Sequence, residues 1–483
     1  MSDSNPFTSR HLLSYLGMLL FFGAGMWFVL VYGSRQHPPP PLAPAQVSDA
    51  RGGTTDSSVA TTFVKILRGN LRTPLSILLL QLVVIIIAAR FFGMLFLKID
   101  QPRVMGEIVA GIVLGPSVLG LLAPRTMEFL FPVSSMETLR LLSQVGVTLF
   151  MFIVGMDLSI AHLRKKAHTA IMVSHASIIV PFLMGAALSL VLYQTLSSGG
   201  TSFTAFALFM GIAMSITAFP VLARILEDRG MSQSRLGSLA ITCAAVDDVT
   251  AWCLLAVVIA IAHAGEMIGS ISTIALTLVF IFLMLFVIKP LLARLIKEQK
   301  EYGQGIFAAV LAFVFVCALV TETIGIHALF GAFLAGVVLP GVEAFRAQFK
   351  ERLQTVTSVV LLPLFFAFSG LRMQISVLSD WYSWWLCAVI ILVAITGKLG
   401  GSTLMARLVG MKWRDSFTLG VLLNTRGLIE LIVLNIGYDL GILSAQTFAM
   451  MVLMALVTTF MTGPLLSLVR FGRSERAAAG RES

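Results

Sequence analysis

The stretch LGSLAITCAAVDDVTAWCLLAVVIAIA, residues 236–262, decides the fold class of this chain. It is apolar for longer than the roughly 20 residues that a helix needs to cross a bilayer. Two adjacent carboxylates, Asp247 and Asp248, lie in its middle. An ionisable side chain at that depth costs about 3 kcal/mol or more, so it requires a partner or a function. The stretch therefore predicts a membrane helix that carries a functional site.

The whole chain has the same character. Of its 483 residues, 57% are hydrophobic and 12% are charged, whereas a soluble domain has about 25% charged residues. Thirteen apolar runs follow one another: 74–97, 103–122, 138–158, 167–193, 203–225, 236–262, 269–293, 304–322, 325–341, 355–372, 384–406, 416–438 and 445–470. We expect an all-α polytopic membrane protein in a lipid bilayer.

Net charge and cysteines exclude other classes. The net charge of +10 suits the Lys- and Arg-rich cytoplasmic loops of membrane proteins, so no nucleic-acid partner is expected. The four cysteines lie inside apolar runs without a CxxC spacing, which supports neither a disulfide framework nor a zinc site. No P-loop or nucleophile motif is found, so neither an enzyme nor a cofactor is predicted.

The N-terminal region differs from the rest. A further apolar run at 12–32 is too long for most cleaved signals and predicts a retained anchor helix within residues 1–33. The stiff segment HPPPPLAPA (37–45) begins a linker over 34–73. The transmembrane domain is expected over 74–470, followed by a short tail over 471–483.

Loop charges predict the orientation. One set of alternate loops holds nearly all of the loop Lys and Arg, whereas the opposite set holds Arg125, Arg140 and Arg372. Because positive loops remain in the cytoplasm, we expect the tail to be cytoplasmic, the linker to be extracytoplasmic, and the protein to lie in the cell (inner) membrane.

Two short matches indicate an internal repeat. AGIVLGP (110–116) resembles AGVVLPG (335–341), and LFMFIVGMDLSI (149–160) resembles LFFAFSGLRMQI (364–375). Both pairs are seven helices apart. Seven is odd, so the two halves must have opposite orientations, as in many transporters that bind substrate where the halves meet.

The strongest counter-ion candidate for the carboxylates is Lys398, within ITGKLGGS (395–402). The surrounding glycines allow close approach of another backbone. Adjacent residues on a helix point about 100° apart, so one aspartate can face this lysine while the other faces an aqueous cavity.

Two helices are expected to be interrupted. In SITAFPVLA (215–223), Pro220 removes a backbone hydrogen bond, and Ser215 and Thr217 add hydroxyl oxygens. In NTRGLIEL (424–431), the residues Asn424, Thr425, Arg426 and Glu430 surround Gly427. Corresponding broken helices point to an ion site, although Arg426 and Glu430, four residues apart, could simply pair with each other.

The Asp-Asp pair, the lysine and NTRGLIELIVLNIG (424–437) together resemble the monovalent cation:proton antiporter family 2, as does GEIVAGIVLGPSVLG (106–120). That family includes bacterial sodium/proton antiporters, potassium-efflux antiporters and plant cation/proton exchangers. The resemblance covers about residues 74–470. It implies a thirteen-helix inverted-repeat antiporter fold with crossing broken helices and a homodimer.

The same resemblance assigns the site residues. It makes Asp248 the carrier of cation and proton and Asp247 the partner of Lys398. Thr217 and the crossing backbone, with Ser215 nearby, would line the cation site, and Arg426 and Glu430 would support it.

Exchange of a cation for a proton follows from competition, because a hard monovalent cation and a proton bind to the same carboxylate oxygens. We expect exchange of a monovalent cation, Na⁺ first, for protons by alternating access. A K⁺/H⁺ antiporter of the same family is the main alternative, and a sodium-coupled organic anion symporter is a weaker one. A channel would require a filter motif or rings of like charge, which the sequence lacks.

Overall fold

The computed structural model describes residues 73–99, 101–157, 167–229, 231, 234–263, 267–297, 303–340 and 342–479, together with scattered positions between 17 and 31. Within these residues the chain is helical, and β pairing is limited to an isolated bridge between Ser197 and Leu443. Ten of the described helices are long and apolar enough to cross a membrane, and the shorter apolar helices Phe203–Ser215 and Ala328–Val338 accompany them. The predicted all-α membrane architecture is confirmed.

The described helices follow the thirteen predicted segments in order. Their bounds are α3 Pro74–Lys98; α4 Arg103–Leu114 with α5 Leu119–Leu122; α7 Val133–Asp157; α9 Ala167–Leu196; α10 Phe203–Ser215 with α11 Phe219–Asp228; α12 Arg235–His263; α13 Met267–Leu283 with π-helical η1 Met284–Ile288 and α14 Lys289–Lys297; α15 Gln304–Ile324; α16 Ala328–Val338; α17 Glu343–Val356 with π-helical η2 Thr357–Leu361 and α18 Leu362–Leu371; α19 Trp381–Ile395 with π-helical η4 Thr396–Gly400 and α20 Gly401–Leu408; α21 Trp413–Leu423 with α22 Leu428–Asp439; and α23 Ala445–Ala479. Short α6 Pro124–Leu130 precedes α7, and the 3₁₀ turn η3 Ile375–Val377 follows α18.

Some predicted boundaries were wrong. The tenth segment begins at Glu343 rather than 355, because α17 is amphipathic and its charged residues lie outside the apolar run. Its apolar residues Phe345, Phe349 and Leu353, four apart, are buried. The last helix continues to Ala479, into the predicted tail, and α7 begins at Val133.

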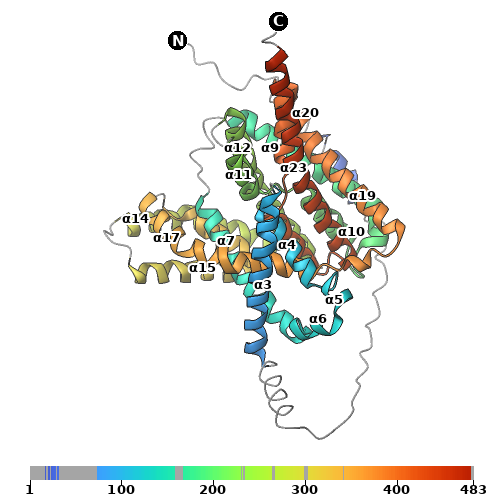
Figure 1. Ribbon diagram of the computed structural model, residues 1–483. Coiled ribbons are helices and arrows are strands. Elements are labelled where there is room, and N and C mark those ends of the chain that lie inside the picture. The colour runs from blue at the N-terminus through green and yellow to red at the C-terminus, as the bar shows by residue number, and fades with distance from the viewer. Residues whose placement is uncertain are drawn as a thin grey trace.

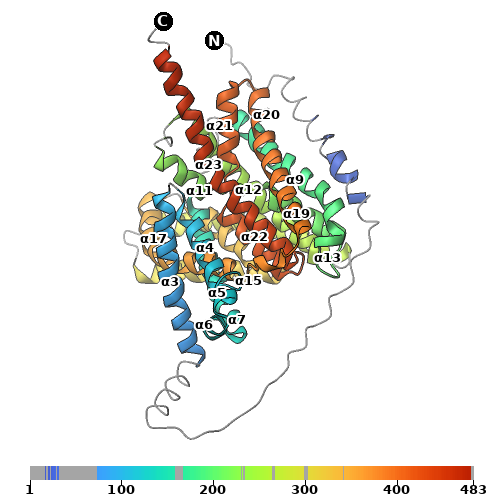
Figure 2. The same ribbon diagram turned by 45° about the vertical axis from the view of Figure 1, so that its right-hand side comes forward.

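The helices pack in two groups (Figure 1). We call α9–α12 with α19–α23 the core group, and α3–α7 with α13–α18 the scaffold group. Within the core group, α9 packs on α10, α12 and α20, while α23 packs on α19, α21 and α22. Within the scaffold group, α4 packs on α3 and α18, and α16 packs on α7 and α15. Figure 2 shows α9, α19, α20 and α23 together, away from α3, α5 and α6.

Glycines reveal the inverted repeat in three dimensions. A Cβ on Gly111 of α4 would collide with the backbone of Ala367 in α18, and one on Gly370 of α18 would collide with Ile108 in α4. The matching glycines behave alike, because Gly155 of α7 and Gly336 of α16 each lie against the other helix at Phe333 and Phe152. In the sequence matches, Gly111 aligns with Gly336 and Gly155 with Gly370. In each of the two crossings, one helix therefore comes from the first repeat and the other helix from the second.

The alignment of the first sequence match also pairs two further glycine contacts, each with the helix that precedes in the chain. Gly106 of α4 lies against the carbonyl of Phe92 in α3, and Gly331 of α16 lies against that of Cys317 in α15. These pairs keep the spacing of the first match, since 106 aligns with 331 and 92 with 317. Small residues that allow close backbone approach are typical of membrane helix interfaces. These contacts support the predicted repeat.

The N-terminal domain boundaries stay a prediction. The described positions of the anchor segment, 17, 20, 21, 23–28, 30 and 31, are helical, and Gly25 lies beside Leu183 of α9. The linker over 34–72 lies outside the described residues.

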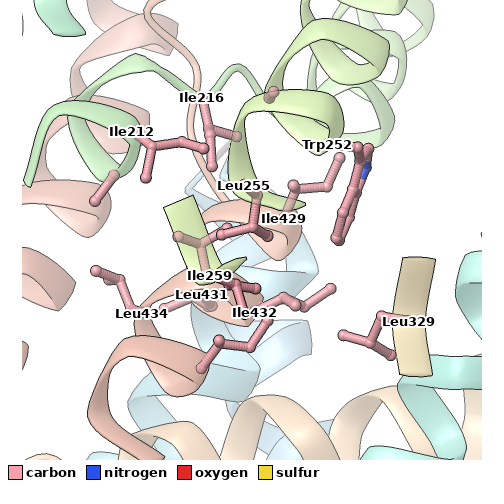
Figure 3. Packing of buried hydrophobic residues seen from close by; sticks show 14 of the residues in the cluster. Ile212, Ile216, Trp252, Leu255, Ile259, Leu329, Ile429, Leu431, Ile432 and Leu434 are labelled. Atoms are coloured by element: carbon pink, nitrogen blue, oxygen red, sulfur yellow. The ribbon is translucent and has the colours of Figure 1, made fainter. Parts of the chain in front are cut away.

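An apolar layer separates the core group from α16 (Figure 3). Ile212 of α10, Leu255 of α12, Ile432 of α22 and Leu329 of α16 all belong to one buried cluster. This layer is apolar on both sides of the contact between α16 and the core group.

Candidate functional site

Two interrupted helices meet at the centre of the core group. The first break, residues 216–218, separates α10 from α11, and Ile216 has extended backbone angles (φ −69°, ψ 137°). The second, residues 424–427, separates α21 from α22. The amide of Ala218 donates to the carbonyl of Thr425 at 3.0 Å, so the two breaks are hydrogen-bonded to each other. Both predicted interruptions are confirmed.

The role assigned to Pro220 requires a correction. The sequence placed it inside a helix whose hydrogen bonding it disrupts, but it lies at the second residue of α11, after the break. A helix does not use the amide N–H of its first turn, so proline fits there without cost. Pro220 thus begins the second half-helix instead of bending a continuous one.

Asp247 of α12 is fully buried and held by fixed donors. The hydroxyl groups of Ser174, Ser177 and Thr217 donate to its carboxylate at 2.5, 2.6 and 2.5 Å. Lys398 Nζ lies 3.7 Å from Asp247 Oδ2, with both side chains inaccessible to solvent. A buried charge is tolerated when it is paired and hydrogen-bonded in this way.

Asp248, the next residue, has a different environment. Its carboxylate faces the backbone amide of Phe219, the first residue of α11. Its Oδ1 atom is buried and has no hydrogen-bond partner. An unsatisfied carboxylate oxygen at a helix break is free to receive a proton or a metal cation.

Lys398 lies on the π-helical turn η4, where the helix widens. It donates to the carbonyl of Ser215 and to the carbonyl of Ser177, the latter at 3.0 Å. The prediction of close backbone approach holds at Gly397, where an added Cβ would lie 3.0 Å from the Cα of Pro181 in α9. An added Cβ on Gly401 would meet the side chain of Val180 in α9, whereas nothing lies within 4 Å of one on Gly400. Close packing of α9 thereby places Lys398 at the end of α10.

Arg426 in the second break is also fully buried. It donates to the carbonyls of Ala213 and Met214 at 2.9 and 2.6 Å, and it lies 3.3 Å from Glu430 Oε1. The last four carbonyls of a helix have no partner within it, and that end carries a partial negative charge. Arg426 therefore pairs with Glu430 and also caps α10.

The other predicted site residues lie close by in sequence and are buried. The Ser215 hydroxyl donates to backbone carbonyls of Gly211 and Ile178, at 2.6 and 3.1 Å. The Thr425 hydroxyl donates to Leu422 at 2.7 Å. Asn424 contacts the sulfur of Met461 through Nδ2, and its Oδ1 is buried without a partner.

Sequence reasoning missed three hydroxyl residues. Ser174 and Ser177 hold Asp247 from α9, and Thr459 of α23 donates to the carbonyl of Arg426 at 2.7 Å. The spacing of Ser174 and Ser177, three apart on an apolar helix, placed both on one face and was a usable signal. Among the described residues, no group of three His, Cys, Asp or Glu side chains could hold a metal ion.

Comparison with known proteins identifies the family. The profile described as "Sodium/hydrogen exchanger, transmembrane" matches residues 67–471. The chain belongs to this sodium/hydrogen exchanger family. Its similarity to the cation/proton antiporters, expected from the sequence motifs, is confirmed.

Three relatives illustrate the range of the family. The chain is 42% identical to the Na(+)/H(+) antiporter NhaS4 of Synechocystis sp., over 81% of this chain and 97% of that protein. It is 39% identical to the Cation/H(+) antiporter 19 of Arabidopsis thaliana (82% and 50% coverage). It is 32% identical to the K(+)/H(+) antiporter 1 of Saccharomyces cerevisiae (83% and 47%). The chain thus spans about half the length of the latter two.

A solved structure has the same fold. The sodium proton antiporter MjNhaP1 from Methanocaldococcus jannaschii at pH 8 matches with a TM-score of 0.56 and 14% sequence identity. The match covers 80% of this chain and 95% of that one. The antiporter architecture predicted for the exchanger is thereby confirmed.

Proposed function

We propose that the chain exchanges a monovalent cation, preferentially Na⁺, for protons across the membrane, with Asp248 as the shared carrier. The observation that carries the assignment is the contrast between the two aspartates. Asp247 is committed to three hydroxyl donors and Lys398, whereas Asp248 keeps a buried oxygen without a partner. Of the two aspartates, Asp248 is therefore the one with a carboxylate oxygen open to a transported ion.

Exchange follows from competition at that oxygen. A proton and Na⁺ are both attracted to the carboxylate, and each excludes the other. The hydroxyl oxygen of Thr217 and the break backbone next to Phe219 are the proposed further ligands, with Ser215 near. Obligatory exchange requires that only the occupied site crosses between the two membrane faces.

Na⁺ is the first choice because the Synechocystis relative named for Na⁺ matches over almost its whole length. The yeast relative is named for K⁺, and it keeps K⁺/H⁺ exchange as the second candidate. An organic anion symporter is disfavoured by the site itself, because both buried cations near it, Lys398 and Arg426, are already engaged by carboxylates and carbonyls.

Everted or reconstituted vesicles test the proposal. A vesicle that is acid inside should lose its pH gradient when NaCl is added, and the response to KCl and LiCl ranks the cations. A gradient that survives all three salts would contradict the proposal.

The remaining assignments are parts of the same proposal. Loop charges favour a cytoplasmic C-terminus in the cell membrane, and a C-terminal fluorescent reporter that matures only in the cytoplasm should be bright. A homodimer is proposed from the family resemblance. The detergent-solubilised particle should then contain two chains of 52.2 kDa when its protein mass is measured by light scattering.

A further inference from the structure

A cluster of charged side chains joins the core group to the scaffold group at the C-terminal end of α22. Arg372, at the end of α18, donates to Asp439 of α22. Arg140 of α7 lies 3.6 Å from the other oxygen of Asp439. One carboxylate of the core group is thus held by two arginines of the scaffold group.

A second set of contacts strengthens this connection. Arg372 also donates to Asn435 Oδ1 at 3.0 Å, and Asn435 Nδ2 donates to the hydroxyl of Ser369 in α18 at 2.7 Å. The guanidinium of Arg372 lies 4.4 Å from the ring centre of Tyr438 in α22. All of these contacts link α22 to α18.

The cluster lines a cavity between the two groups. Arg140, Arg372 and Asp439 line that cavity together with buried Val147, Leu329 and Ile432. Side-chain exposure is 13% at Arg372 and 17% at Asp439, but Ile432 is only 1% exposed. The charged residues therefore lie nearer to water, and the apolar residues of Figure 3, including Leu329 and Ile432, lie deeper.

A second cavity borders the other end of α22. It is lined by Arg426, Gly427 and Leu431, and by Met105 and Ile108 of α4. One helix, α22, thus begins at the proposed ion site, separates two cavities and ends in the charged cluster.

We propose that Arg372, Asp439, Asn435 and Arg140 form a latch that holds α22 of the core group against α7 and α18 of the scaffold group and must release in every transport cycle. Its role in transport rests on the proposed exchange function. The contact itself does not, because it concerns only how α22 is held against α7 and α18. Releasing the latch lets α22 move away from α18 and exposes the cavity wall at Ile432.

Cysteine labelling tests the latch without requiring transport. The four native cysteines are replaced by alanine, Ile432→Cys is introduced, and the protein is placed in nanodiscs, where both faces are open to a membrane-impermeant maleimide. Asp439→Asn and Arg372→Gln should each raise the labelling rate about tenfold, which corresponds to about 1.4 kcal/mol in the closing equilibrium.

The matched control is Glu137→Gln. Glu137 is 62% exposed and pairs with Arg140 on its own helix, so its ion pair does not link two helices. The variant therefore removes a charge beside the cluster but leaves the contacts between α22 and the scaffold group in place. It should change labelling by less than about twofold, since exposed pairs contribute little. Unchanged labelling in both Asp439→Asn and Arg372→Gln overturns the latch.

A parallel measurement separates this result from the function. Cation-driven proton movement is recorded for the same variants in vesicles. If the Ile432→Cys parent with an intact latch exchanges no cation while labelling is raised in the latch variants, the latch contact is supported and the exchange function is contradicted. Normal exchange with unchanged labelling contradicts the latch alone.

Discussion

Lys398 and Arg426 cap consecutive carbonyl groups at the end of α10. Lys398 donates to the carbonyl of Ser215, and Arg426 donates to that of Met214 at 2.6 Å. The negative end of the helix dipole thus stabilises both cations independently of the carboxylates near them. Replacing Lys398 or Arg426 should therefore also leave a carbonyl at the end of α10 without its side-chain donor.

Asp248→Asn is expected to abolish cation-dependent proton movement while the protein keeps its thermal stability in detergent. The amide retains the shape of the side chain but exchanges no proton, and Asp248 Oδ1 gives up no existing hydrogen bond. Vesicle exchange and a thermal melt measure the two outcomes. Substantial residual exchange would remove Asp248 from the carrier role.

Asp247→Asn serves as the comparison for that variant. Its carboxylate accepts three hydroxyl hydrogens and faces Lys398. Breaking a buried pair by removing one partner costs about 3–5 kcal/mol. This variant should melt clearly below the parent, and equal melting of the two asparagine variants would contradict the assigned difference.

The apparent affinity for Na⁺ should weaken as the pH falls. Protons and Na⁺ compete for the Asp248 carboxylate, so a higher proton concentration requires more Na⁺ for half-maximal exchange. Titrations of reconstituted protein at several pH values measure this shift. An affinity that is constant across pH would contradict competition at one site.

Lys398→Gln should reduce the response of exchange to membrane potential. If Lys398 carries a second proton, each cycle moves two protons against one cation, and a net charge is driven by about 2.3 kcal/mol per 100 mV. The measurement uses proteoliposomes clamped with potassium and valinomycin, with Na⁺ as substrate. A variant that keeps the full voltage response would leave Lys398 as a structural cap of α10.

Arg426→Gln should lower stability more than the double change Arg426→Gln with Glu430→Gln. The single change leaves Glu430, which is fully buried, without its partner at 3.3 Å. The double change removes both charges, so only the lost caps of Ala213 and Met214 remain. The melting midpoints of Arg426→Gln, Glu430→Gln and the double variant are compared with that of the parent in a double-mutant cycle. Strict additivity of the two single effects would show that the pair is not coupled.

Gly111→Ala and Gly336→Ala should destabilise the protein to a similar degree. Each added Cβ collides with backbone at an equivalent crossing, and overpacking costs about 1–3 kcal/mol. Gly305→Ala in α15 is the control, because nothing lies within 4 Å of its added Cβ. A harmless Gly336→Ala beside a damaging Gly111→Ala would mean that the two crossings are not equivalent.

The sequence predicted the thirteen segments and both helix breaks because membrane burial makes apolar length and interruptions visible in the chain. Lys398 was found for the same reason, since a lysine within an apolar run is conspicuous. The repeat was visible as two short matches, whereas its packing at Gly111 and Gly370 required coordinates.

Other features could not be predicted. Hydrogen bonds from Ser174 and Ser177 to Asp247 depend on how α9 turns, and hydroxyl residues are common in membrane helices. The start of α17 was not predicted because this helix is amphipathic, and its charged residues interrupt the apolar run that marks a membrane helix. Arg372 was counted as a loop charge, and only the fold shows that it reaches Asp439, 67 residues away in the chain.

The hydrogen bond from Ala218 to Thr425 has a mechanical consequence. Arg426 ties the second break to the end of α10 as well, and Thr217 lies 3.4 Å from the carbonyl of Leu423. The two breaks, one from each half of the chain, are therefore fastened into one joint. A displacement of either break should therefore carry the other with it, so under the proposed exchange an ion held there would keep ligands from both breaks as they move.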